Sequence, residues 1–153
     1  MPHIHEKIDF CVEVFVVYKN KVLLRMHDKH KIWLSIGGHI ELDENPIQTA
    51  IREAKEEVGL NVKIVDLRYI LDDEPDYKHL IPPRYLDSHY VNGTHKHIVF
   101  VYFAISDTDV TSDSKMEHER AETRWLTKEE LVTMNLRPNV LFYATEALKE
   151  LGK

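Results

Sequence analysis

The chain has 153 residues, of which 43% are hydrophobic and 30% are charged, and its net charge is −6 with the histidines neutral. This length and composition exclude a disordered or fibrous chain, and we expect residues 1–153 to form a single domain. The negative charge argues against long nucleic acid as a partner, because nucleic acid binds to basic faces.

The expected location follows from the cysteine content and the apolar runs. Cys11 is the only cysteine, so no internal disulfide can form, which is typical of a reducing compartment. The first residues lack an apolar signal core, and the longest apolar run, residues 98–105, is too short to span a bilayer. We therefore expect a cytoplasmic protein with no membrane partner.

The first part of the chain is predicted to be rich in strands. Residues 8–18 alternate between apolar and polar side chains, which predicts a strand with one buried face. Residues 19–20 are typical of a turn, and residues 22–24 continue as the second strand of a hairpin. Residues 33–36 predict a further short strand. The apolar face of the first strand consists of Ile8, Phe10, Val12, Val14 and Val16.

Residues 46–58 carry the clearest helix signals in the sequence. Asn45 is a favourable N-cap, Pro46 occupies the first helical position, and Gln48 completes a capping-box pattern. Gly59 is placed to end the helix in the left-handed conformation that glycine tolerates. These signals predict both ends of the helix.

The second half of the chain alternates between strand and helix signals. Residues 61–71 predict a strand, and the polar residues 72–96 predict a long loop or insertion, a kind of segment that is often functional. Residues 98–105 are continuously apolar, as expected of a central strand covered on both faces. Residues 125–126 predict a last short strand.

Two helices are predicted near the C-terminus. Thr127 caps the first of them, with Glu130 three residues later, and residues 138–151 form the second. Strands interleaved with helices indicate an α/β (α+β) fold in which a mixed sheet lies between helical layers.

The helix over residues 46–58 also predicts chemistry. On a helical wheel of roughly 100° per residue, one side is an apolar stripe and the other side carries three carboxylates. Like charges one turn apart repel, so a compensating cation is expected. Arg52 can pair with Glu56, and Mg²⁺ or Mn²⁺ prefers carboxylate oxygens; a solvated acidic face is the alternative. The stripe is Ile47, Ile51, Ala54 and Val58, and the carboxylates are Glu53, Glu56 and Glu57.

Residues that precede this helix extend the candidate site. Gly37 and Gly38 precede it and allow the backbone to approach a ligand closely and to donate N–H groups to phosphate oxygens. Glu44 adds a fourth carboxylate before the helix. Arg25, on the second predicted strand, can reach a phosphate, although an exposed strand arginine is the ordinary interpretation.

Residues 38–60 resemble the Nudix box, in which glycine, glutamate, Arg-Glu and Glu-Glu recur at fixed spacing. The resemblance has no insertion and covers nine constrained positions, but it spans only this part of the chain. The matching residues are Gly38, Glu44, Arg52, Glu53, Ala54, Glu56, Glu57, Gly59 and Leu60.

The resemblance implies a Nudix-type α/β/α sandwich and a hydrolase. Nudix enzymes use a divalent cation to hydrolyse a nucleoside diphosphate linked to another group X. The resemblance assigns Glu56 and Glu57 as metal ligands, and Glu53 as either a ligand or the catalytic base. Arg52 would orient these glutamates, and a carbonyl of Gly37 or Gly38 would complete the metal shell.

Other residues are candidates outside the box. The family often adds a late carboxylate, for which Glu119 is the first choice and Glu122 the second, against the alternative of an exposed charged loop. His95 and His97 would lie on one side of a strand. No cysteine accompanies them, so a zinc site is not favoured, and contact with phosphate is the alternative.

The resemblance leaves the substrate open. Asn139 resembles the base-contacting asparagine of MutT-like members, which favours a nucleoside triphosphate or related nucleotide. Pro75 resembles a marker for ADP-ribose, and Tyr77 resembles a marker for dinucleoside polyphosphates, so these larger substrates are the alternative. A binding module without hydrolysis is a third hypothesis, disfavoured because all box carboxylates are present. A homodimer is also compatible with the family.

Overall fold

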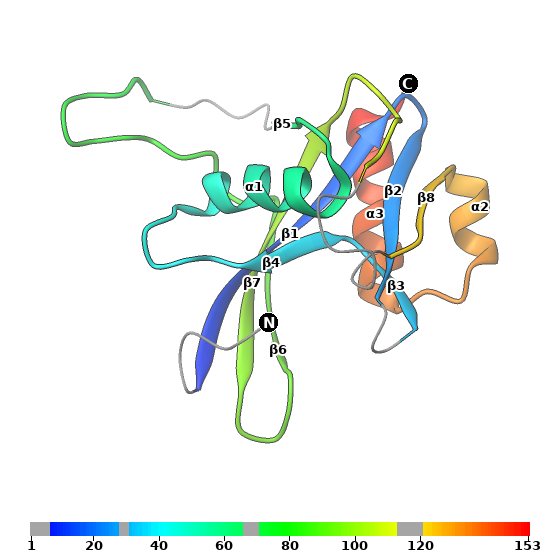
Figure 1. The fold of residues 1–153 in the computed structure, drawn as a ribbon, viewed down its shortest axis with the longest axis horizontal. Helices are drawn as coiled ribbons and strands as arrows, with labels where there is room; N and C mark the ends of the chain where they lie inside the picture. The colour runs from blue at the N-terminus through cyan, green and yellow to red at the C-terminus, as the bar shows by residue number, and fades with distance from the viewer. Residues whose placement is uncertain (1–6, 28–30, 66–70, 113–120) are drawn as a thin grey trace.

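The computed structural model describes residues 7–27, 31–65, 71–112 and 121–153. Its eight strands form one mixed sheet, which lies between α1 on one face and α3 on the other (Figure 1). The predicted mixed sheet between helices is therefore confirmed. In chain order the elements are β1 (Ile8–Tyr18), β2 (Lys21–His27), β3 (Ile32–Leu34), β4 (Ile36–His39), α1 (Pro46–Val58), β5 (Lys63–Ile64), β6 (Tyr85–Tyr90), β7 (Lys96–Ile105), β8 (Thr123–Leu126), α2 (Lys128–Thr133) and α3 (Pro138–Leu151).

The centre of the sheet is a parallel pair. Strands β1 and β7 run side by side from the pair Ile8↔Lys96 to the pair Val17↔Ile105 (Figure 1). The order through the centre is β3-β2-β1-β7-β5, and β8 extends the sheet beside β2. This arrangement explains why residues 98–105 are continuously apolar, since a central strand is covered on both faces.

Both central strands change neighbours along their length. Strand β1 pairs with β4 through residues 11–14 and with β2 through residues 17–18. Strand β7 pairs with β6 through residues 96–101 and with β5 through residues 104–105. The sheet therefore forks, and β2 and β4 separate beside β1. This fork is where the cleft described below lies.

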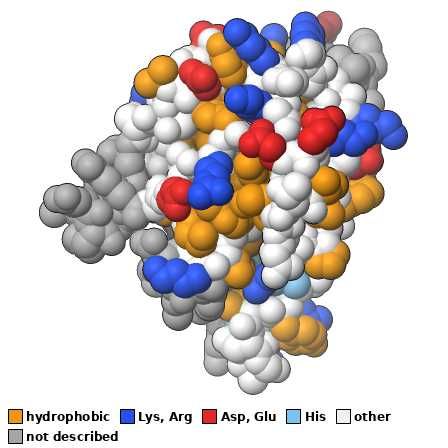
Figure 2. All heavy atoms as spheres, turned by 90° about the vertical axis from the view of Figure 1, so that its right-hand side faces the viewer, with side chains coloured by type: hydrophobic (Ala, Val, Ile, Leu, Met, Phe, Trp, Pro, Cys, Tyr) orange, Lys and Arg blue, Asp and Glu red, His pale blue; other side chains and the backbone are white. Residues whose placement is uncertain are grey.

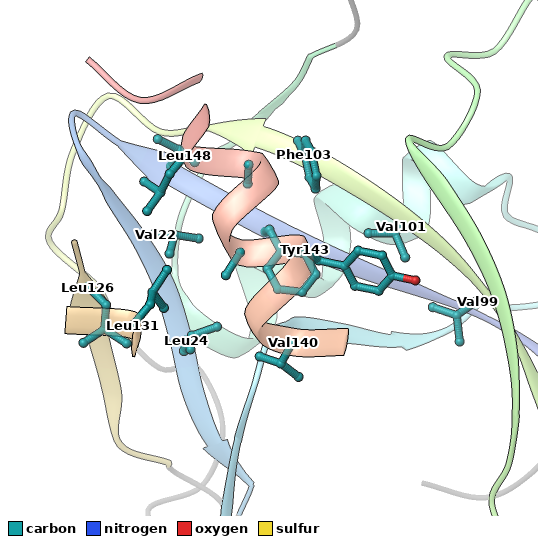
Figure 3. Packing of buried hydrophobic residues seen from close by; sticks show 14 of the residues in the cluster. Val22, Leu24, Val99, Val101, Phe103, Leu126, Leu131, Val140, Tyr143 and Leu148 are labelled. Atoms are coloured by element: carbon teal, nitrogen blue, oxygen red, sulfur yellow. The ribbon is translucent and has the colours of Figure 1, made fainter. Parts of the chain in front are cut away.

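The core consists of two layers, one on each face of the sheet. In the layer beneath α3, Phe15 makes edge-to-face contacts with Phe103 and Tyr143 at ring-centroid distances of 6.3 and 5.8 Å. Figure 3 shows the Tyr143 ring extending from α3 toward Val101. The second layer, beneath α1, includes Ala50, Ala54, Val58, Val12, Val14 and Val16.

The structure corrects the predicted strand boundaries and faces. Strand β1 does not have one buried face: Phe10 is 45% exposed, whereas Cys11, Phe15 and Val17 of the opposite face are buried. A hairpin strand was expected to be half-solvated, but β1 is central. The predicted loop 72–96 contains β6, which pairs with β7. Of the strand predicted over residues 61–71, the described part forms only Lys63–Ile64.

The helix ends agree with their sequence signals. The Asn45 side chain caps α1 and Gln48 completes the capping box, while Gly59 ends the helix with a φ of 71°. Thr127 and Glu130 form the second capping box at α2. Helix α3 begins at Pro138, which occupies its first turn.

The face on the right of Figure 1, which carries α2 and β8, mixes acidic and basic side chains around hydrophobic atoms (Figure 2). Among the residues drawn in colour, this face has no continuous basic stripe of the kind that long nucleic acid requires. In the described part of the chain, no helix combines the length and hydropathy needed to cross a lipid bilayer.

Candidate functional site

The carboxylates of α1 lie on both sides of the helix. Glu56 is 48% exposed, but Glu53 and Glu57 are only 2% and 7% exposed and face the sheet. The predicted separation of an apolar side from an acidic side is therefore wrong, and Ile51 of the predicted apolar stripe is 43% exposed. Two buried carboxylates in one helix require specific compensation, because burial of an unpaired charge is costly.

Strand β4 supplies space and a hydrogen bond for these carboxylates. A Cβ added at Gly38 would lie 2.2 Å from Oε1 of Glu53, so only glycine allows Glu53 to pack against the strand. The Gly37 N–H donates to Oε1 of Glu57 at 2.9 Å. The two glycines singled out in the sequence thus position two glutamates.

Arg52 joins the remaining acidic groups into one network. Its guanidinium donates to both carboxylate oxygens of Glu44, at 2.6 and 2.9 Å. It also donates to Glu53 at 3.0 Å, to Glu56 at 3.2 Å and to the carbonyl of His39 at 3.3 Å. The planar fork of arginine makes these simultaneous contacts possible. We refer to Glu44, Arg52, Glu53, Glu56 and Glu57 as the acidic site.

The electrostatics of the acidic site are unbalanced. The hydrogen bonds from Arg52 lower the pKa of Glu44 to about 2, and the same pairing raises the pKa of Arg52. Burial, together with the nearby charge of Glu57, raises the pKa of Glu53 to about 7 despite its contact with Arg52. The guanidinium of Arg52 alone therefore does not neutralise the four carboxylates, and with Arg25 beside Glu57 the site still has two cations for four carboxyl groups.

A divalent cation fits this set of residues. Carboxylates that share one site repel one another, and Mg²⁺ or Mn²⁺ binds carboxylate and carbonyl oxygens. Glu53, Glu56 and Glu57 come together on α1, and the Gly38 backbone packs against Glu53. These groups provide the donors that such a cation needs.

A cleft of about 430 Å³ opens beside Glu57 at the fork of the sheet. Arg25 forms an ion pair with Glu57 at 2.8 Å and lines the same cleft. Arg25 is therefore not the exposed strand arginine of the alternative interpretation. The lining consists of Cys11, Val12, Glu13, Arg25, His27, Leu34, Ser35, Gly37, Gly38, His39, Glu57, His89, Val91, His97 and Val99.

Two titratable groups of β1 line the cleft, the partly buried Glu13 and the buried Cys11. Burial and the charge of Asp87 raise the pKa of Glu13 to about 7, and Oε2 of Glu13 has no hydrogen-bond partner among the described residues. Burial raises the pKa of Cys11 to about 12, with contributions from Asp9 and Glu13. A thiol with this pKa stays protonated and is not an activated nucleophile. Glu13 was missed in the sequence because it appeared only as a polar position within an alternating strand.

Several predicted contacts lie away from the cleft. Tyr77 is 49% exposed, Asn139 is exposed at the start of α3, and neither lines the cleft. Pro75 is likewise exposed. Glu122 pairs with Arg124 at 3.2 Å and does not line the cleft. Glu119 lies outside the described residues.

The two histidines of the sequence do lie close together. The rings of His95 and His97 make an edge-to-face contact with centroids 5.4 Å apart. His39, which was not singled out in the sequence, joins them through a contact of 3.2 Å between its Nε2 and that of His97. The sequence feature that could have identified His39 is its position directly after Gly38.

Comparison with known proteins identifies relatives along almost the whole chain. The family model described as NUDIX domain matches residues 10–146. A hydrolase of the NUDIX family from Clostridium perfringens is 41% identical, with a TM-score of 0.81 over 94% of this chain and 97% of that one.

More distant relatives share the fold or part of the sequence. The MutT NUDIX hydrolase from Burkholderia pseudomallei has 18% identity and a TM-score of 0.65 over 95% of this chain and 99% of that one, which shows the same fold. The NAD-capped RNA hydrolase NudC of Vibrio atlanticus is 39% identical over 61 residues. That match covers 39% of this chain and only 22% of the relative's length.

Proposed function

This chain belongs to the Nudix family of hydrolases, which act on nucleotide-linked pyrophosphates, and on that premise we propose a more specific activity. The protein uses Mg²⁺, or Mn²⁺ in its place, to cleave a pyrophosphate bond in a single nucleotide. A nucleoside triphosphate of the kind used by MutT-like enzymes is the first substrate to test.

The observation that carries this proposal is the position of Glu57. Its two carboxylate oxygens are fixed by the Gly37 N–H at 2.9 Å and by Arg25 at 2.8 Å. The same side chain lines the cleft and lies one helical turn from Glu53. A cation held by these glutamates would therefore meet a phosphate group bound in the cleft.

Each residue of the site has a proposed task. Glu53, Glu56, Glu57 and the Gly38 carbonyl hold the cation, with Glu53 also the candidate base. Arg52 positions the glutamates through its fork. Once bound, the cation neutralises phosphate charge and lowers the pKa of water.

The chain's own residues complete the substrate site. The guanidinium of Arg25 faces the cleft beside Glu57, where it can bind a phosphate oxygen. The Gly37–Gly38 segment lines the same wall and allows a phosphate to approach the backbone closely. Apolar side chains farther along the lining, among them Leu34 and Val99, exclude water and can contact a nucleoside.

The size of the cleft favours a small substrate. Pockets for compact ligands have volumes of roughly 300–1,000 Å³, and about 430 Å³ lies at the lower end of that range. A dinucleoside polyphosphate or ADP-ribose would extend beyond the described lining. Tyr77 and Pro75, which resembled markers for those substrates, are exposed and outside that lining.

A substrate panel with and without chelator tests the proposal. We expect turnover of a nucleoside triphosphate in Mg²⁺, none in EDTA, and recovery when Mg²⁺ or Mn²⁺ is returned. The panel includes oxidised triphosphates, ADP-ribose and dinucleoside polyphosphates. Turnover in excess EDTA would contradict the metal requirement, and turnover of only the larger compounds would contradict the substrate class.

The binding-module hypothesis gives a different result in the same panel. A protein that only senses nucleotides would bind them tightly, as measured by calorimetry, without releasing phosphate under any metal condition. That outcome would overturn the proposed activity even though it retains the proposed cleft.

A further inference from the structure

A second group of side chains that could ligate a metal ion lies beside the cleft, and two of its members line the cleft. It consists of Asp9 on β1, His39 on β4, and His95 and His97 at the start of β7, and we call it the histidine cluster. Asp9, His39 and His95 are 1%, 5% and 3% exposed. None of these four residues has a task in the proposed hydrolysis.

The sheet register brings the cluster together. Asp9 lies opposite His97 in the parallel β1–β7 pair, and His39 lies opposite Cys11 in the β1–β4 pair. His95 precedes β7, and its ring contacts that of His97. These strands are neighbours in the lower part of the sheet in Figure 1. The imidazoles are therefore fixed by backbone pairing rather than by a flexible loop.

Close approaches between nitrogen and oxygen atoms connect the members of the cluster. Oδ2 of Asp9 lies 3.2 Å from Nε2 of His95 and 3.7 Å from Nε2 of His39. Nε2 of His39 lies 3.2 Å from Nε2 of His97. In a tetrahedral zinc site with bonds near 2.0–2.1 Å, neighbouring ligand atoms are about 3.3 Å apart.

The possible ligand atoms divide into two triads rather than one group of four. Ligand atoms of Asp9, His95 and His97 all lie within 4.8 Å of one another, as do those of Cys11, His39 and His97. His97 belongs to both. The triad of Asp9, His95 and His97 contributes a carboxylate charge to the ion, whereas Cys11 would have to release a proton to do so.

The chemistry of the donors selects a class of metal. Imidazole nitrogens bind zinc, copper, nickel and iron, whereas Mg²⁺ prefers oxygen ligands throughout. The two imidazoles and one carboxylate of Asp9, His95 and His97 therefore differ from the oxygen donors of the acidic site. Without a metal ion, two close acceptor atoms must share one proton between their lone pairs. A metal ion instead accepts one lone pair from each ligand at the same time.

We propose that Asp9, His95 and His97 form a second cation site, which takes one zinc-type transition metal ion. The ion cross-links β1 and the start of β7, and His39 lies next to His97 in the same cluster. Because His97 also lines the cleft, the ion places a positive charge in the cleft wall. The sequence alone did not favour this site, because only His95 and His97 are close together along the chain.

Titration of the chelator-treated protein with Co²⁺ tests the proposal. Tetrahedral Co²⁺ with nitrogen ligands absorbs visible light strongly, whereas Co²⁺ bound only by oxygens in octahedral geometry absorbs weakly. We expect a strong band that saturates at one equivalent, is removed by one equivalent of Zn²⁺ and persists in excess Mg²⁺. No band, or a band displaced by Mg²⁺, would overturn the proposal.

Variants assign the band to the cluster. Asp9→Asn and His97→Ala should weaken metal binding by at least about tenfold. His79→Ala is the matched control, since it removes a histidine outside the cluster, and Glu57→Gln removes a carboxylate of the acidic site. Both should keep the band. A band lost in Glu57→Gln and kept in His97→Ala would overturn the proposal.

A thermal readout keeps the proposal testable if a variant fails to fold. Zn²⁺ at roughly a hundred times its dissociation constant should raise the melting temperature of the unmodified chain by about 5–10 °C. The same shift is expected in Glu57→Gln. Absence of the shift in both proteins would overturn the second site independently of any histidine variant and of the proposed hydrolysis.

Discussion

Two clusters of ionisable side chains border the same cleft, and they are assembled in opposite ways. The acidic site takes its charged groups from residues 44–57, nearly all of them on one helix. The histidine cluster takes one residue from β1, one from β4 and two from the region where β7 begins. One cluster follows from local helical periodicity, and the other exists only through strand pairing.

This difference explains why one cluster can be predicted from the sequence and the other cannot. Spacing of three and four residues places carboxylates next to one another in any helix, whatever surrounds it. Neighbouring strands bring together residues from distant parts of the chain, and their register depends on the whole sheet. The first cluster is therefore visible as a motif, and the second requires the fold.

The largest change in unfolding free energy is expected from a substitution that disrupts the acidic site alone. Arg52→Met leaves Glu44, Glu53 and Glu56 without their shared cation, and removal of one partner from a partly buried network costs about 3 kcal/mol of unfolding free energy. Urea unfolding measures this loss. Arg124→Met is the control, because Arg124 and Glu122 are more than half exposed and should cost under about 1 kcal/mol. Equal losses would contradict the network.

The next prediction concerns the glycine between the two clusters. In Gly38→Ala the new Cβ meets Oε1 of Glu53 at 2.2 Å, so the carboxylate must move. We expect kcat to fall roughly 100-fold, as for loss of a positioned catalytic group. Gly93→Ala is the control, since a Cβ there meets nothing within 4 Å. Unchanged kcat in Gly38→Ala would show that the position of Glu53 does not matter.

A third prediction uses the buried carboxyl that lies between the clusters. The folded pKa of Glu13 is about 7, above its usual 4.5, so the folded chain binds this proton more tightly than the unfolded chain. Stability from this group is therefore present at low pH and lost as pH rises through about 7. Glu13→Gln should add about 2 kcal/mol at about pH 8 and little at about pH 4.5.

Urea unfolding at several pH values checks the Glu13 prediction. The variant curve should approach the original curve as pH falls. A constant difference at all pH values would mean that packing, rather than ionisation, causes the change.

The smallest effects are expected outside both clusters. Tyr77→Ala and Asn139→Ala alter exposed residues that do not line the cleft. Stability should change by less than about 0.5 kcal/mol and kcat/KM by less than about twofold. Steady-state kinetics on the substrate identified by the panel provides the measurement. A tenfold loss in either variant would extend the substrate site to that part of the surface.

The sequence predicted those parts of the fold that depend on local signals. Helix α1 begins and ends where Asn45, Pro46 and Gly59 indicate, because caps act within one turn. Strand β6 was missed because its partner β7 supplies the pairing and its own side chains are mostly exposed. The burial pattern of β1 was wrong because the alternation does not show that a strand is central.

The candidate site was predictable in composition but not in burial. The motif gives the order of the glutamates along the helix but not their burial. Gly38 leaves room for Glu53, and the carboxylate of Glu57 is bound by the Gly37 N–H and Arg25. Arg25 was named only as a weak candidate, since its contact with Glu57 depends on the fork between β2 and β4. Contacts between side chains from different strands were therefore the hardest part of the site to predict from the sequence.

The most direct test of the proposed activity is the Mg²⁺ dependence of turnover in the original chain and in Glu57→Gln, with His79→Ala as control. We predict saturable activation by Mg²⁺ in the original chain and the control, and a loss of roughly 100-fold or more in Glu57→Gln at saturating Mg²⁺. Equal turnover in Glu57→Gln and the original chain would contradict the proposal that the acidic site holds the catalytic cation.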